Sequence, residues 1–209
     1  MNSARELSVA EVRGDLERLG VQVGDLLHVH ASLRRIGRVN GGADGVLDAL
    51  ESAVGADGTL FMTLGSRDDW DWVNSHPETQ RAALLEGSPP FDHLSSPADP
   101  EVGVLAEMLR QRPGTLVNNH PDGRFAAVGR LAEHLTAEGP WDDYYGAGSA
   151  LERLVQAGGR VLRLGADLDT VTVLHYAEHL VALPRKRRVR RHHLVADPEH
   201  PDGQVVRAV

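Results

Sequence analysis

The alternation of helix-like and strand-like segments constrains the fold of this chain more than any other feature. Residues 8–19 begin with a capping box and carry apolar residues at helical spacing, and residues 26–30 (Leu-Leu-His-Val-His) are typical of a buried strand. A second helix is expected over 43–54 and a second strand over 58–62. This order predicts an α/β fold in which a mixed central β-sheet is flanked by helices.

The same alternation returns in the second half of the chain after one long interruption. Residues 65–100 hold acidic, tryptophan, histidine and proline residues with little periodicity, so we expect a long irregular loop that contributes to substrate binding. Further helices are expected over 102–111, 129–136, 149–157 and 172–183, and further strands over 161–165 and 203–209.

The size and charge of the chain exclude several classes of protein. Its 209 residues fit one domain, and 30 acidic against 22 basic side chains give a formal charge of −8. This charge disfavours nucleic acid or an anionic membrane as the main partner and suits a polycationic ligand. The absence of cysteine excludes a disulfide framework, a thiolate metal site and a cysteine nucleophile. No apolar run approaches the ~18 residues of a membrane span, so we expect a cytoplasmic protein. Whether it forms a homodimer stays open.

The segment from Thr172 onward contains the side chains with the clearest chemical use. On a helix, His175, Glu178 and His179 fall on one side because they are three and four residues apart. A histidine beside a carboxylate is suited to general base catalysis near neutral pH. The same residues also fit the H-x-x-E-H pattern of inverted zinc peptidases. Spacing alone favours a third interpretation, in which His175 is a core histidine and His179 a surface one, both without catalytic function.

Short motifs in a fixed order resemble the aminoglycoside 3-N-acetyltransferase family. The resemblance runs from about Val9 to Val209, and each motif is weak by itself. The motifs are His-Ala-Ser-Leu-Arg-Arg-Ile-Gly at 30–37, Gly-Gly at 41–42, 54–62, Asn-His-Pro at 119–121, 125–129, Tyr-Gly-Ala-Gly-Ser at 145–149, and 161–166 leading to 172–178.

The resemblance implies that the chain transfers an acetyl group directly from acetyl-coenzyme A to an amine of the 2-deoxystreptamine ring of an aminoglycoside antibiotic. It implies that His175 is the catalytic base. Glu178 is a candidate for the carboxylate beside it, and a role in helix capping or in a surface ion pair is the alternative. His120 is a further catalytic candidate, although its motif has Val117 where the family usually has arginine. That departure leaves open a structural role for His120, in which it orients a loop near the site.

The resemblance also implies the residues that hold the two substrates. No metal is expected in this reaction. Coenzyme contacts are expected from Ser32, Leu33, Arg34, Arg35, Gly37, Ser149 and Thr172, where Ser149 is equally suited to capping a helix. Acidic and aromatic contacts to the aminoglycoside are expected from Asp68, Asp69, Trp70 and Asp71.

Two alternatives to the acetyltransferase remain open from the sequence. One is a zinc-dependent hydrolase that uses His175, Glu178 and His179, and the other is a coenzyme- or aminoglycoside-binding fragment without turnover. We expect residues 1–209 to form a single acetyltransferase domain that lacks the family's C-terminal segment and therefore part of its acidic pocket. The basic run 184–191 is interpreted as a solvated or coenzyme-facing stretch rather than a nucleic-acid arm.

Overall fold

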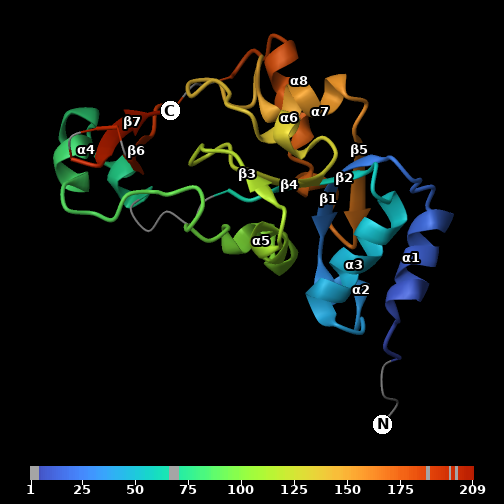
Figure 1. Ribbon diagram of the computed structural model, residues 1–209. Helices are drawn as coiled ribbons and strands as arrows, with labels where there is room; N and C mark the ends of the chain where they lie inside the picture. The colour runs from blue at the N-terminus through green and yellow to red at the C-terminus, as the bar shows by residue number, and fades with distance from the viewer. Residues whose placement is uncertain (1–4, 66–70, 187–188, 198, 201) are drawn as a thin grey trace.

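A mixed β-sheet forms the centre of the molecule (Figure 1). The computed structural model describes residues 5–65, 71–186, 189–197, 199–200 and 202–209. Among these residues the sheet has five strands in the order β3-β4-β2-β1-β5. β1 (Leu26–Ala31) is parallel to β2 (Thr59–Thr63) and β5 (Arg160–Leu164), whereas β4 (Phe125–Gly129) is antiparallel to β2 and to β3 (Leu116–Val117). The mixed sheet expected from the sequence is confirmed.

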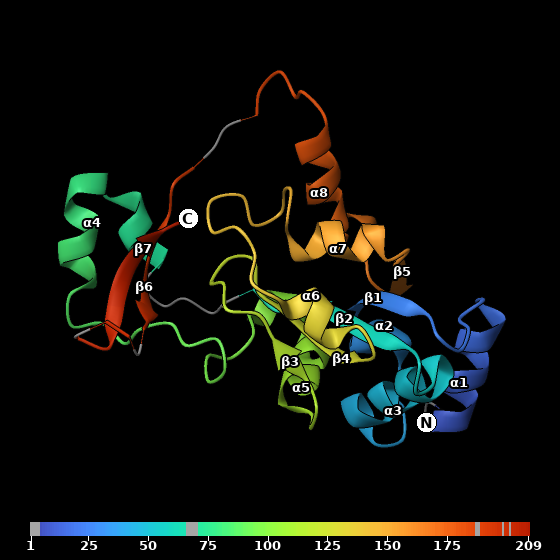
Figure 2. The same cartoon turned by 45° about the horizontal axis from the view of Figure 1, so that its top comes forward.

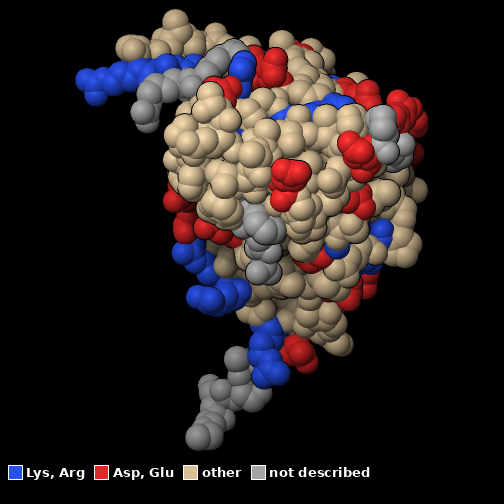
Figure 3. Space-filling view, turned by 90° about the vertical axis from the view of Figure 1, so that its left-hand side faces the viewer, with Lys and Arg blue, Asp and Glu red and all other residues tan. Residues whose placement is uncertain are grey.

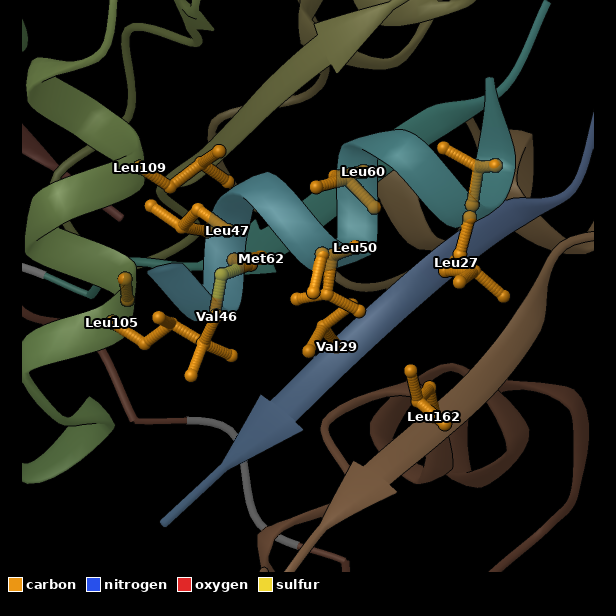
Figure 4. Close-up of a cluster of buried hydrophobic side chains, with 14 of the residues drawn as sticks. Leu27, Val29, Val46, Leu47, Leu50, Leu60, Met62, Leu105, Leu109 and Leu162 are labelled. Carbon is orange, nitrogen blue, oxygen red and sulfur yellow. The ribbon is translucent and has the colours of Figure 1, made fainter. Parts of the chain in front are cut away.

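Three helices cover one face of the sheet. They are α1 (Val9–Arg18), α3 (Gly42–Val54) and α5 (Val104–Gln111). Ser8 caps α1 with the expected capping box, because its side chain accepts from the backbone of Glu11 while the Glu11 carboxylate accepts from the backbone of Ser8. Figure 4 shows side chains from β1, β2 and β5 meeting those of α3 and α5 in one apolar cluster. Labelled members are Leu27, Val29, Val46, Leu47, Leu50, Leu60, Met62, Leu105, Leu109 and Leu162.

The opposite face of the sheet carries the other three main helices. Figure 2 shows α7 (Ala150–Gln156) and α8 (Val173–Leu180) on this side, together with α6 (Ala132–Thr136). Alternate residues of β1 point this way, so His28 lies against Phe61 with ring centroids 5.0 Å apart. A second apolar cluster forms here from Leu26, Phe61, Phe125, Ala127, Ala132, Leu135, Ala150, Leu151, Leu154 and Tyr176.

A small unit lies beside the sheet and joins distant parts of the chain (Figures 1 and 2). It comprises η1 (Asp71–Ser75), α4 (Glu78–Leu85) and the antiparallel pair β6 (His192–Ala196) and β7 (Gln204–Ala208). Val73, Leu85 and Leu194 form its buried core, so the segment after β2 and the last strands stabilise each other.

The structure corrects several expected boundaries. Residues 65–100 are not wholly irregular, because α4 occupies 78–85 and buries Leu85 in the core of the small unit. The expected helix over 129–136 begins only at Ala132, and the helix expected over 172–183 ends at Leu180. A short helix, α2 (Leu33–Ile36), follows β1 and was not expected from the sequence. None of the described helices is long and apolar enough to span a membrane.

Candidate functional site

A cavity of about 600 Å³ opens at the carboxyl ends of the three parallel strands. His30 and Ala31 at the end of β1, Thr63 at the end of β2 and Gly165 after β5 all line it. Open α/β sheets bind ligands at the carboxyl ends of their strands, and small-molecule sites are typically about 300–1,000 Å³. The cavity therefore has the place and size of a substrate site.

Five of the seven residues predicted to contact a coenzyme line this cavity: Ser32, Leu33, Arg34, Arg35 and Thr172. Sheet geometry holds the first four, because the Ser32 amide donates to the carbonyl of Leu164 at 2.9 Å. Arg35 donates to the carboxylate of Asp167 at 2.6 Å, and this partner raises the arginine pKa. Arg34 brings positive charge to this wall of the cavity, whereas the charge of Arg35 is matched by Asp167, which also lines the cavity. The Arg34 guanidinium suits an anionic ligand.

The other two predicted coenzyme residues lie elsewhere. Gly37 ends α2 with φ of +97°, a conformation that favours glycine, and it does not line the cavity. Ser149 is 1% exposed and caps α7, where its hydroxyl accepts from the amide of Glu152 at 3.2 Å. The geometry therefore supports the capping alternative for Ser149.

Sequence reasoning missed part of the cavity wall. Thr63 and the segments 101–105 and 165–167 also line it, and each lies at or soon after the end of a strand or short helix. The strand ends at Thr63 and Leu164 could have indicated two of these, since the carboxyl ends of parallel strands meet at one edge. The segment 101–105 carried no comparable signal, because only the tertiary fold brings it across the sheet.

A buried arginine fixes the chain that leads into segment 101–105. Arg124 is fully buried and donates to the carbonyls of His93, Ser96 and Pro97 at 2.6, 2.5 and 3.0 Å. Burial lowers the pKa of Arg124 to about 10, so it remains a cation at neutral pH. Three main-chain carbonyls of this irregular stretch thus accept hydrogen bonds from one buried guanidinium, which ties the stretch to β4.

Helix α8 brings the predicted base next to the cavity. Its first turn starts at Thr172, which lines the cavity and accepts from the amide of His175 at 3.0 Å. The Nδ1 atom of His175 lies 3.2 Å from Oε2 of Glu178, as the helical spacing predicts. Both side chains are about half exposed, at 52% and 53%. Within the described chain Nε2 of His175 has no hydrogen-bond partner, so this nitrogen is available to a substrate.

An aromatic side chain without a predicted role, Tyr145, packs against the predicted base. The ring of Tyr145 lies parallel to that of His175, with centroids 5.3 Å apart and 7° between the planes. The Tyr145 hydroxyl donates to the carbonyl of Asp122 at 3.4 Å, and the ring contacts Phe125 edge-on at 6.2 Å. Burial raises the pKa of Tyr145, so it stays neutral.

His120 is engaged by the main chain around it. Its Nδ1 accepts from the amides of Asp122 and Gly123 at 3.2 and 2.8 Å, so Nε2 carries the proton and donates to the carbonyl of Trp141 at 3.1 Å. Burial lowers the pKa of His120 to about 4. Because both nitrogens are used by the loop, the geometry favours the loop-orienting role over proton transfer.

The second histidine of the H-x-x-E-H pattern is also engaged within the protein. Nδ1 of His179 lies 2.7 Å from the carbonyl oxygen of His175, and Nε2 lies 2.9 Å from Oδ1 of Asp143. No group of three or more His, Asp or Glu side chains able to hold a metal ion occurs in the described part of the chain. The pattern is thus accounted for by hydrogen bonds that fix the loop over 142–146 to α8.

The predicted aminoglycoside contacts fall mostly beyond the described residues. Asp68, Asp69 and Trp70 lie outside them, and the backbone of Asp71 opens η1. Figure 3 views the molecule from the side of the small unit and shows acidic side chains scattered over that face, with Lys and Arg mainly toward its edges.

Relatives of known function match nearly the whole chain. A family model described as Aminoglycoside 3-N-acetyltransferase matches residues 28–207. Aminoglycoside N(3)-acetyltransferase VIII of Streptomyces fradiae is 48% identical over 177 residues, which cover 84% of this chain and 62% of that relative. The chain therefore spans less than two thirds of that relative's length.

Two solved structures share the fold. A binary complex of AAC-IIIb with CoASH is 38% identical with a TM-score of 0.88, and the match covers 98% of this chain and 75% of that one. AAC-VIa bound to sisomicin is 32% identical with a TM-score of 0.86 and the same two coverages, 98% and 75%.

Proposed function

Because the chain belongs to the aminoglycoside 3-N-acetyltransferase family, we propose that it transfers the acetyl group of acetyl-coenzyme A to an amine of the 2-deoxystreptamine ring of an aminoglycoside. One observation carries the proposal. The His175–Glu178 pair, 3.2 Å apart, stands one helical turn beyond a residue that lines the cavity at the strand ends. The relatives named above support the choice of reaction, and one of them was solved with CoASH. The names of these relatives do not favour a zinc hydrolase.

The cavity residues are suited to hold the coenzyme. Arg34 supplies positive charge for its phosphates and Arg35, held by Asp167, supplies further N–H donors, while Leu33, Val102 and Leu105 supply apolar surface for its uncharged arm. Acetyl-coenzyme A provides an activated acetyl group and a thiol leaving group. Because cells supply this coenzyme in their interior, we expect the reaction in the cytoplasm.

His175 performs the proton transfer in this scheme. An aminoglycoside amine is protonated at neutral pH, so His175 removes a proton through Nε2 while Glu178 holds Nδ1–H. The amine lone pair then forms the new N–C bond, the C–S bond breaks, and its electron pair leaves on sulfur. His175 releases this first proton to solvent. Once the N–C bond has formed the nitrogen carries a second surplus proton, which His175 accepts and passes to the departing sulfur, so each cycle yields the amide, the thiol and one released proton and leaves the protein unchanged.

The aminoglycoside is expected on the acidic side of the site. We assign Asp68, Asp69, Trp70 and Asp71 to it, because several carboxylates are needed to hold several ammonium groups. The net charge of −8 supports a polycationic acceptor. Glu178 adds a carboxylate near the reacting amine.

Thiol release from acetyl-coenzyme A tests the proposal directly. Release measured over a panel of aminoglycosides is expected to require the antibiotic and to fall about 10²–10⁴-fold in His175→Ala, the range for loss of a general base. Coenzyme binding to that variant, measured by calorimetry, is expected to persist. Binding of both substrates without turnover in the intact chain would leave only a binding function, and full activity of His175→Ala would overturn the assignment of the base.

A further inference from the structure

Three side chains from different elements form a hydrogen-bonded chain beneath the start of α8. Nε2 of His28 in β1 lies 3.1 Å from Oγ1 of Thr63 in β2. The Thr63 hydroxyl in turn donates to Oγ1 of Thr172 at 3.0 Å. This series of hydrogen bonds therefore runs from the interior of the sheet to the wall of the cavity, since both threonines line the cavity.

In this series each side chain donates to the next one toward the cavity. His28 is completely buried, and burial lowers its pKa well below the usual value, so the ring is neutral and carries one proton. The Thr63 hydroxyl has a single proton, which it gives to Thr172, so it must accept the Nε2 proton of His28. This leaves Nδ1 of His28 as a lone pair, and Nδ1 has no partner among the described residues. An unpaired acceptor beside Phe61 is a smaller loss than an unpaired N–H would be.

The hydroxyl proton of Thr172 is the last donor in this series of hydrogen bonds. Its oxygen accepts from Thr63, and no acceptor for its own proton exists in the described part of the protein. Hydrogen bonds in series polarise one another, so His28 and Thr63 strengthen Thr172 as a donor. Thr172 stands three residues before His175, on the turn that joins the cavity to the base.

We propose that the Thr172 hydroxyl donates a hydrogen bond to the carbonyl oxygen of the acyl thioester, with His28 and Thr63 as positioning residues behind it. The inference rests on the proposed acetyl transfer. Negative charge develops on that oxygen when the amine attacks, and a fixed donor at that position stabilises it. No proton leaves Thr172: the electron pair of the C–S bond departs on sulfur, and His175 handles the amine proton.

A spectroscopic experiment tests the hydrogen bond without turnover. Isotope-edited infrared spectra of acetyl-coenzyme A labelled with ¹³C at the carbonyl are recorded with the protein in the absence of aminoglycoside. The carbonyl stretch is expected to shift to lower frequency in the wild-type protein, to lose the shift in Thr172→Val and to regain it in Thr172→Ser. In Thr63→Val the shift to lower frequency is expected to be smaller than in the wild-type protein. Equal frequencies in wild type and Thr172→Val would overturn the proposal.

Steady-state rates give the second readout. Thr172→Val is expected to lower kcat about 10²-fold, as for removal of one such donor, while KM for acetyl-coenzyme A changes less than about threefold. The double variant Thr63→Val/Thr172→Val is expected to match Thr172→Val alone, because Thr63 acts through Thr172. Additive losses would assign both threonines to folding and overturn the relay.

The matched control is Thr136→Val. It removes a hydroxyl that donates to the carbonyl of Ala132 within α6, far from the cavity lining, and both readouts are expected to stay at wild-type values. The two hypotheses fail separately. A carbonyl shift without aminoglycoside-dependent thiol release contradicts the proposed function alone, whereas turnover with an unaffected Thr172→Val contradicts this inference alone.

Discussion

The imidazole of His175 lies flat against the phenol ring of Tyr145, 5.3 Å between centroids and 7° between planes. A half-exposed histidine on a short helix would otherwise sample several rotamers. Glu178 holds one edge of the ring and Tyr145 holds one face, so only Nε2 is left for a substrate amine. The orientation of the proposed base is therefore set by two neighbours from different parts of the chain.

Removing the Tyr145 ring is expected to slow the reaction. Stacked aromatic pairs contribute about 0.5–1.5 kcal/mol, so Tyr145→Leu should reduce kcat by up to about tenfold. Tyr145→Phe keeps the ring and loses only the 3.4 Å bond to Asp122, so it should lose less. Thiol-release kinetics measure both variants. An equal loss in the two would assign the effect to the hydroxyl instead of the stack.

Glu178→Gln is expected to lower kcat about tenfold while leaving KM for acetyl-coenzyme A unchanged. The amide keeps an oxygen that can hold Nδ1–H but loses the charge that stabilises the protonated ring. The loss should be smaller than the ~10²–10⁴-fold loss expected when the base itself is removed. Glu133→Gln, which neutralises an exposed carboxylate on α6, controls for net charge. If Glu178→Gln were as inactive as His175→Ala, Glu178 would be the proton acceptor.

The free energy of unfolding is expected to decrease as the pH is lowered, because His120 titrates. Its pKa is about 4 in the folded protein and about 6.5 when unfolded, so the unfolded state binds more protons between these values. Stability is then complete above pH 6.5 and is lost as pH falls toward 4, by on the order of 2 kcal/mol between pH 7 and 5.

Urea unfolding at pH 7 and pH 5 measures this change in the free energy of unfolding. His120→Asn offers an oxygen near the position of Nδ1 and does not titrate, so its stability should depend less on pH than that of the wild type. A slope equal to that of the wild type would show that other groups, such as the buried His28 and the partly buried His30, carry the whole effect.

Ser149→Ala separates capping from coenzyme binding. Loss of the hydroxyl that accepts from the Glu152 amide should reduce the free energy of unfolding by about 1 kcal/mol. KM for acetyl-coenzyme A should not change, because Ser149 is buried outside the cavity lining. Ser149→Thr, which keeps a capping hydroxyl, should recover most of the stability. A large rise in KM would restore Ser149 as a coenzyme contact.

Local sequence patterns predicted the elements that local physics determines. The capping box at Ser8, the apolar run of β1 and the i, i+3 pair of His175 and Glu178 depend only on neighbours in the chain, and the structure has all three. Helix α4 was missed because prolines and acidic residues around it suggested a loop. Its stability depends on Leu85 meeting Leu194, more than a hundred residues away.

The sequence by itself determined the α/β class, the family and the helical pair that forms the proposed base. Tertiary structure alone decided which predicted residues share a site. It gathered Ser32, Arg35 and Thr172 around one cavity and left Ser149 at a helix cap, because parallel strands bring their carboxyl ends together whatever their separation in sequence. It also placed Tyr145 on His175, and His28 and Thr63 behind Thr172, contacts between elements that no local pattern encodes.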